Sequence, residues 1–225
     1  MGGTAVRREK SKKKLGRKQY ALTILSRLAL LLGLNIVLNV APLFPFQGRR
    51  VMEEGAGISP THVIWEETAH KGKWDGDYRY LAANEDTAVF SRMRFHWGYG
   101  WESSFTYLMN QHTPDPIHAK WIREYGSGRG GYNFFYLVGY VASDQVASVE
   151  YQIDWEDYSE STIVIAEEDY IYEDGKRYYV YDGCDYVRQF SEEDIQSSFI
   201  YDITAIARDA RGEILYQRSI YHDLP

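Results

Sequence analysis

The chain has 225 residues, of which 44% are hydrophobic, 16% aromatic and 25% charged, and its formal net charge is −7. A chain of this length can bury a sizeable core. Its one cysteine, Cys184, excludes an internal disulfide, so that core must be held together by packing.

Charge is distributed unevenly on either side of an uncharged stretch at 28–48. Residues 1–50 contain eleven Lys and Arg against Glu9 alone, a balance of about +10, which leaves −17 for the remainder. The basic residues are concentrated near the N-terminus, where attraction to anionic lipid is their simplest use. This distribution argues against a nucleic-acid partner for the acidic body.

The uncharged stretch predicts a membrane anchor. Its 21 residues would form a helix of about 31 Å, close to the roughly 30 Å hydrocarbon core of a bilayer. Its strongly apolar side chains favour insertion by roughly 3–7 kcal/mol in total. We expect a basic cytoplasmic tail at 1–19 and a single-pass transmembrane anchor in the cell membrane, contacting the lipid bilayer through 20–46. The basic tail keeps the N-terminus inside, so the rest of the chain is expected to be extracytoplasmic.

Two alternatives bear on this segment. A cleaved secretory signal fits less well than a signal-anchor, because Asn39-Val40-Ala41 followed by Pro42 is a poor cleavage site. The second alternative is a homodimer formed in the membrane through the small residues Ala29 and Gly33.

After a charged linker at 47–58, the segment 59–126 is expected to mix helix and strand. A short helix can begin with Ser59 as N-cap and Pro60 at the first helical position. Residues 62–65 fit a strand equally well.

Further along the same segment, strands are expected at 87–96 and 105–109. Asp115-Pro116 then predicts the start of a helix that ends at Gly126. Its apolar face would contain Ile117, Trp121, Ile122 and Tyr125.

The last part, 131–225, predicts an antiparallel β-sandwich. The chain has 35 aromatic residues, which lie among Val, Ile and Thr in short runs separated by Gly, Asp and Ser. Asp174-Gly175 is a strong signal for a type I′ hairpin turn, because glycine adopts positive φ without steric cost. The expected strand pairs are 132–142 with 146–155, 163–172 with 177–181, and 199–208 with 214–221.

Two sequences in this part, VGYVASDQVASVEYQID at 138–154 and YDITAIARDARGEIL at 201–215, carry a family resemblance. They resemble a strand pair and the closing hairpin of immunoglobulin-like modules on bacterial surface proteins. The resemblance covers about 130–225 and implies an immunoglobulin-like sandwich with an adhesive or spacer role, and no catalytic residues. The expected fold is therefore mainly β: this sandwich, a short preceding α/β segment, and a single N-terminal transmembrane helix.

A tyrosine-rich strand pair is the candidate binding face. If Asp174-Gly175 forms a two-residue turn, one side of the hairpin carries Tyr170, Tyr172, Arg177, Tyr179 and Tyr181. The other side carries Ile163, Ile165, Ile171, Tyr178 and Val180 and should be core. Exposed tyrosines beside charged groups suit sugar rings or a protein partner. Packing of segment 59–126 over these rings is an equal alternative.

Catalytic motifs are weaker. GSGRGG at 126–131 matches a phosphate-binding loop, but the expected order is helix then strand, the reverse of what that motif needs. Cys184 with Arg188 and His112 or His118 gives the inventory of a sortase. However, Asp182 and Asp185 flank the cysteine and would raise the pKa of its thiol. We expect no catalytic residue, no metal site and no cofactor.

The sequence thus predicts a membrane-anchored, extracytoplasmic, non-catalytic module of a bacterial cell envelope. Its partner would be an envelope protein or polysaccharide. The alternative is an envelope enzyme, either a sortase-like transpeptidase or a carbohydrate-active enzyme.

Overall fold

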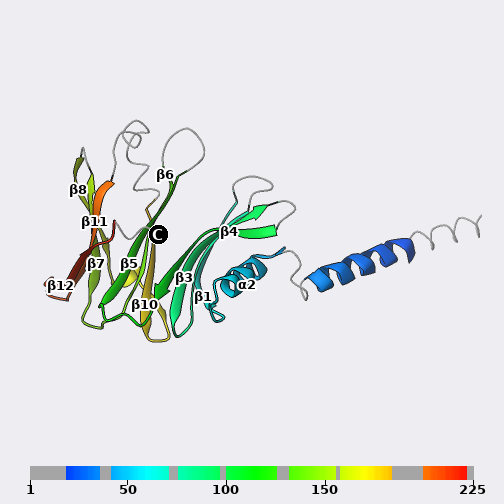
Figure 1. The fold of residues 1–225 in the computed structure, drawn as a ribbon, viewed down its shortest axis with the longest axis horizontal. Coiled ribbons are helices and arrows are strands. Elements are labelled where there is room, and N and C mark those ends of the chain that lie inside the picture. The colour runs from blue at the N-terminus through cyan, green and yellow to red at the C-terminus, as the bar shows by residue number, and fades with distance from the viewer. Residues whose placement is uncertain are drawn as a thin grey trace, which may run out of the picture. The chain divides into compact units, whose positions relative to one another are not determined.

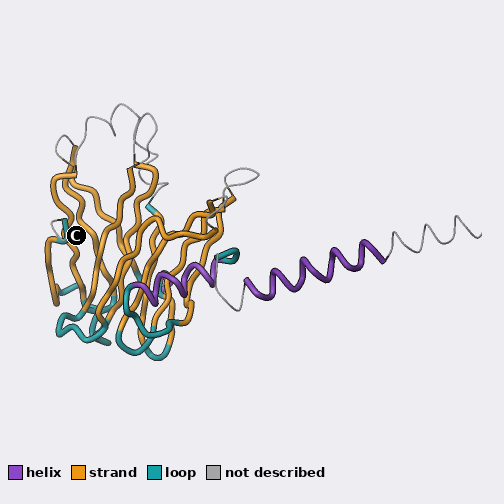
Figure 2. The backbone as a smooth tube through the Cα atoms, turned by 45° about the vertical axis from the view of Figure 1, so that its right-hand side comes forward, coloured by secondary structure: helices purple, strands orange, loops and turns teal. Residues whose placement is uncertain are grey.

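The computed structural model describes residues 19–35, 42–70, 76–96, 100–125, 132–155, 158–183 and 200–221. Residues 19–35 are helical, α2 spans Pro45–Gly55, and the other described elements are strands apart from one 3-10 turn, as Figures 1 and 2 show. The strands are β1 His62–His70, β2 Gly76–Ala83, β3 Thr87–His96, β4 Gly100–Asn110, β5 Ile117–Tyr125, β6 Tyr132–Val141, β7 Ser148–Trp155, β8 Tyr158–Ile165, β9 Ile171–Glu173, β10 Lys176–Asp182, β11 Ile200–Arg208 and β12 Ile214–Ser219, and the 3-10 turn η1 spans Glu167–Asp169.

The strands form three four-stranded antiparallel sheets. We call β1-β2-β3-β4 the first sheet, β5-β6-β10-β9 the middle sheet and β12-β11-β7-β8 the outer sheet. The prediction of a mainly β, antiparallel chain is confirmed. Segment 59–126, expected to mix helix and strand, contains only strands and their connections in its described residues.

The chain divides into two compact units. The smaller unit contains α2 together with Ala69–Tyr78 and Met93–Ser104. The larger unit contains Ile58–Thr68, Arg79–Arg92 and the chain from Phe105 onward, which includes the middle and outer sheets. The candidate sites described below lie in the larger unit.

Helix α2 replaces much of the expected linker at 47–58. The side-chain oxygen of Gln47 accepts a hydrogen bond from the backbone N–H of Phe44 at 3.2 Å, which caps the first turn. Gly48 lies against Trp101, where an added Cβ would come within 2.8 Å of the backbone oxygen. The segment is therefore a capped helix that packs closely on β4.

The middle sheet is buried on both faces. Between the middle and outer sheets lies the outer core, which includes Phe135 and Leu137, and between the first and middle sheets lies the first core, which includes Tyr136 and Val138. Successive residues of β6 thus point alternately into two cores, as expected of a strand covered on both sides. Because both faces are covered, the middle sheet has no broad face exposed to solvent among the described residues.

The predicted helix at 115–126 is wrong, because the structure has strand β5 there. Strand β5 pairs with β6 from Ile117 opposite Val141 onward. Ile117, Ala119 and Trp121 point into the outer core, which is the period-two pattern of a strand. These apolar residues fit both the 3.6-residue period of a helix and the two-residue period of a strand. Pairing with β6 selects the strand.

The predicted single strand at 163–172 is also wrong. Ile163 and Ile165 end β8 in the outer sheet, and the chain then crosses through η1 to β9 in the middle sheet. The backbone N–H of Ala166 donates to a carboxylate oxygen of Asp169 at 3.0 Å and closes the turn. The acidic residues of η1 are exposed, as suits a surface crossing.

The expected anchor at 20–46 is described only in part, because residues 36–41 lie outside the described residues. In the portion of the chain that the structure covers, none of the helices combines the length and the apolar character required to cross a bilayer.

Candidate functional site

The five residues of the expected tyrosine face do not share one exposed surface, contrary to the prediction from the sequence. Tyr172 lies opposite Arg177 as predicted, and its side chain is 54% exposed. Tyr170 is 7% exposed and Tyr179 is 0% exposed, and both belong to the outer core, against which Tyr181 also packs. The face is covered because the outer sheet packs over it.

Tyr179 and Tyr170 each make a specific contact with a polar side chain. The hydroxyl groups of Tyr151 and Tyr179 are 2.7 Å apart, and the Arg177 guanidinium lies over the Tyr170 ring at 5.4 Å. Burial raises the pKa of Tyr170 to about 12, and it raises the pKa of Tyr179 as well. The rings therefore stay neutral and act as core residues.

Strands β1–β4 of segment 59–126 cover the opposite side of the middle sheet. Tyr178, Val180 and Ile171 pack in or against the first core, together with Phe90 from β3. The alternative that segment 59–126 packs over the rings of Tyr170 and Tyr179 is therefore wrong, because its strands β1–β4 cover the other face.

A surface pocket in the larger unit is the candidate functional site, and we call it the hairpin pocket. Its volume is about 580 Å³. It is formed by the start of β1, the β2–β3 turn and the β9–β10 hairpin. Its polar lining residues are His62, Asn84, Glu85, Asp174, Lys176 and Tyr178.

Local turn chemistry builds two sides of this pocket. In the β2–β3 turn, the Asn84 side-chain oxygen accepts hydrogen bonds from the backbone N–H groups of Asp86 and Thr87 at 2.9 and 2.8 Å. In the β9–β10 turn, Asp174 and Gly175 have φ values of 50° and 75°, as a type I′ turn requires. The predicted hairpin turn is confirmed.

Gln111, a buried residue just after β4, links the parts of the hairpin pocket. Its side-chain N–H donates to the backbone oxygen of Asn84 at 3.1 Å. Its side-chain oxygen accepts from the Tyr178 hydroxyl at 3.2 Å and from the Lys176 ammonium. Burial raises the pKa of Tyr178, and the hydrogen bond with Gln111 opposes that shift. The side of the pocket near Gln111 is therefore a hydrogen-bonded polar network.

Two histidines lie beside carboxylates in this region. The Nε2 atom of His62 is 3.3 Å from Glu173 Oε1 and 3.9 Å from Asp174 Oδ2. The Nε2 atom of His112 is 2.8 Å from Asp86 Oδ1. Of the two histidines only His62 lines the hairpin pocket, where it can hold a polar ligand together with Asp174 and the Lys176 ammonium by hydrogen bonds and charge.

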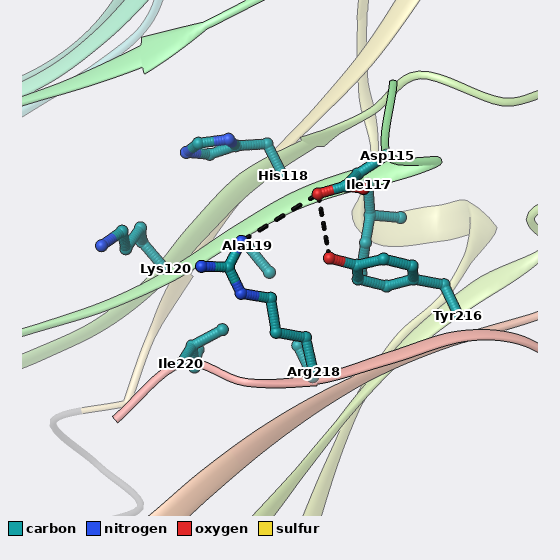
Figure 3. Close-up of a pocket in the computed structure, with 9 residues that line it drawn as sticks. Asp115, Ile117, His118, Ala119, Lys120, Tyr216, Arg218 and Ile220 are labelled. Carbon is teal, nitrogen blue, oxygen red and sulfur yellow. Dashed lines mark hydrogen bonds and ion pairs between the residues drawn. The ribbon is translucent and has the colours of Figure 1, made fainter. Parts of the chain in front are cut away.

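A smaller pocket lies between β5 and β12, and Figure 3 shows its polar side chains. Its volume is about 30 Å³, enough for roughly one water molecule. The Tyr216 hydroxyl donates to Asp115 Oδ2 at 3.0 Å, and Arg218 is 4.0 Å from the same oxygen. This arrangement joins the edges of the middle and outer sheets and leaves little room for a ligand.

The residues of the sortase-like alternative are only partly described. Cys184 and Arg188 lie outside the described residues, as does the glycine-rich sequence at 126–131. His112 contacts Asp86, and the His118 ring stacks on Tyr140 with ring centroids 5.7 Å apart.

The hairpin pocket was not found from the sequence. His62, Asn84, Gln111 and Lys176 come from four separate segments, and no spacing joins them. The Asn84 and Asp174-Gly175 turns were the available local signals. No family model, curated protein or solved structure matches the chain.

Proposed function

We propose that the chain is a non-catalytic binding module that is tethered to a membrane and holds an envelope polysaccharide in the hairpin pocket. The tether is supported by the helix at 19–35, whose leucines are exposed. Leu22, Leu30 and Leu31 are 65%, 64% and 63% exposed. Successive residues of a helix are about 100° apart, so Leu30, Leu31 and Leu32 point in different directions around it. Exposed leucines on several sides of a helix favour an apolar environment.

The hairpin pocket is the main feature that supports the binding role. Its volume of about 580 Å³ lies within the roughly 300–1,000 Å³ usual for ligand sites. Its amide, carboxylate, ammonium and phenol groups offer the donors and acceptors that sugar hydroxyl groups use. A concave pocket of this size favours a short polymer segment over a protein surface.

Vesicle flotation tests the tether. The full chain is expected to float with vesicles of phosphatidylcholine and phosphatidylglycerol. The double variant Leu30→Asp, Leu31→Asp should stay at the bottom of the gradient, because each charge near the centre of an inserted helix costs about 2.5–3.5 kcal/mol. The matched control is Ile214→Asp, Leu215→Asp, which charges two exposed apolar residues of β12 and should float. Equal flotation of the two variants would contradict the tether.

Co-sedimentation with isolated cell-envelope polysaccharide tests the binding role. Lys176→Ala removes the cation of the hairpin pocket and should lower the retained fraction several-fold. Arg211→Ala removes an exposed cation from the β11–β12 turn and should leave retention unchanged. If both variants bind like the wild type, or if the wild type does not bind, this pocket is not a polysaccharide site.

A further inference from the structure

We propose that His62, Glu173 and Asp174 bind a divalent transition metal ion, with Zn²⁺ as the best fit. Among the residues that the structure describes, this is the group of three His, Cys, Asp or Glu side chains whose ligand atoms all lie within 4.8 Å of one another. The inference rests on these three side chains, and it depends on neither the tether nor the polysaccharide.

Two of the separations between the ligand atoms are close to those around a tetrahedral ion. Bonds of about 2.0–2.2 Å from Zn²⁺ to nitrogen and oxygen place neighbouring ligand atoms roughly 3.3–3.5 Å apart. The observed separation of 3.3 Å between His62 Nε2 and Glu173 Oε1 is such an edge. Asp174 Oδ2, at 3.9 Å from the same nitrogen, reaches this range with a shift of a few tenths of an ångström.

The hairpin turn is what brings both carboxylates to one histidine. Neighbouring residues of a strand point to opposite faces, so Glu173 and Asp174 would diverge if β9 continued. Instead the chain turns at Asp174, where φ is 50°. His62 begins β1, so a bound ion would link the first sheet to the middle sheet within the larger unit.

Charge and ligand type determine the preferred ion. Two carboxylates balance the charge of a divalent ion, and an imidazole selects Zn²⁺ over the oxygen-seeking Ca²⁺ and Mg²⁺. Three protein ligands leave one tetrahedral position for water or another ligand. His62 and Asp174 also line the hairpin pocket, so this position has open space beside it. The nearby Lys176 ammonium is already bonded to the Gln111 side chain and, at 3.4 Å, to the backbone oxygen of Glu85.

Isothermal titration with ZnCl₂ tests the site in the metal-free full chain, held in detergent micelles with any affinity tag removed. We expect one saturable Zn²⁺ site that excess Ca²⁺ does not displace. His62→Ala should weaken binding about tenfold or more. The control His112→Ala removes a second exposed histidine, which is paired with Asp86 but belongs to no group of three ligands in the described residues, and should change affinity less than about twofold.

Asp174→Asn provides the second variant, because asparagine tolerates the left-handed conformation of this turn position. It should keep the fold and still weaken Zn²⁺ binding. Zn²⁺ should also raise the melting temperature of the wild type and of His112→Ala, but not that of His62→Ala. Absence of saturable binding, or equal losses in His62→Ala and His112→Ala, would overturn the proposal.

Discussion

At Tyr179, a side chain with a hydroxyl group lies fully inside the outer core, where its oxygen is 2.7 Å from that of Tyr151. A buried hydroxyl group that loses its hydrogen-bond partner costs about 1–3 kcal/mol. The rings of the two tyrosines supply apolar area, and their hydroxyl groups bond to each other. The Tyr179 hydroxyl group also donates to the His118 backbone oxygen at 3.5 Å.

This pairing predicts the effect of removing a single oxygen atom. Tyr179→Phe should lower the free energy of unfolding by about 1–3 kcal/mol, because the Tyr151 hydroxyl group stays buried without that partner. The control Tyr172→Phe removes an exposed hydroxyl group and should change it by less than about 0.5 kcal/mol. Urea denaturation of both variants measures the difference. Equal effects would show that the Tyr151–Tyr179 contact contributes nothing specific.

The buried tyrosines also predict the pH dependence of stability. Burial raises the pKa of Tyr140 and of Tyr170 to about 12, from a usual value of 10.0. Above pH 10 the unfolded chain loses these protons first, so the free energy of unfolding should fall as the pH rises from about 10 to about 12. Below pH 10 this contribution is fully present. Urea denaturation at about pH 9 and pH 11 tests this, and unchanged stability would contradict it.

At the scale of elements, the sequence was informative where the signal is local. The Asp174-Gly175 turn and the opposition of Tyr172 and Arg177 follow from turn chemistry and were predicted correctly. Strand β5 was missed, because only its pairing with β6 separates it from a helix. The hairpin pocket was missed for the same reason, since its residues meet only in the folded chain.

The pairing of β6 with its neighbours gives a prediction at Gly139. A Cβ at this position would collide with the backbone oxygen of His118 and with the Tyr179 side chain. Gly139→Ala should therefore lower the free energy of unfolding by about 1–3 kcal/mol, the usual cost of overpacking. Gly55→Ala is the control, because its Cβ would meet nothing within 4 Å. Thermal melts of the two variants compare them, and equal midpoints would argue against this close approach.

At the scale of the larger unit, the unforeseen feature is a sheet with cores on both faces. The sequence of β6, YNFFYLVGYV, is apolar nearly throughout, which is typical of a strand buried on both sides. That signal was present in the sequence. The tyrosines of β10 nevertheless suggested that one face of its hairpin is exposed to solvent, because tyrosine suits both a core and a binding surface. The middle sheet instead shares its residues between the first and outer cores.

A shared middle sheet should make the three layers of the larger unit unfold together. Phe90 packs in the first core, with its ring centroid 5.4 Å from that of Tyr136 on β6. Phe90→Ala should lower the free energy of unfolding by about 3–5 kcal/mol. Because Phe135 and Leu137, the neighbours of Tyr136 on β6, belong to the outer core, hydrogen exchange should accelerate equally at residues 88–91 of β3 and in β7 of the outer sheet. If exchange accelerates in β3 while β7 keeps its protection, the outer sheet is stable without the first core, and the middle sheet does not couple them.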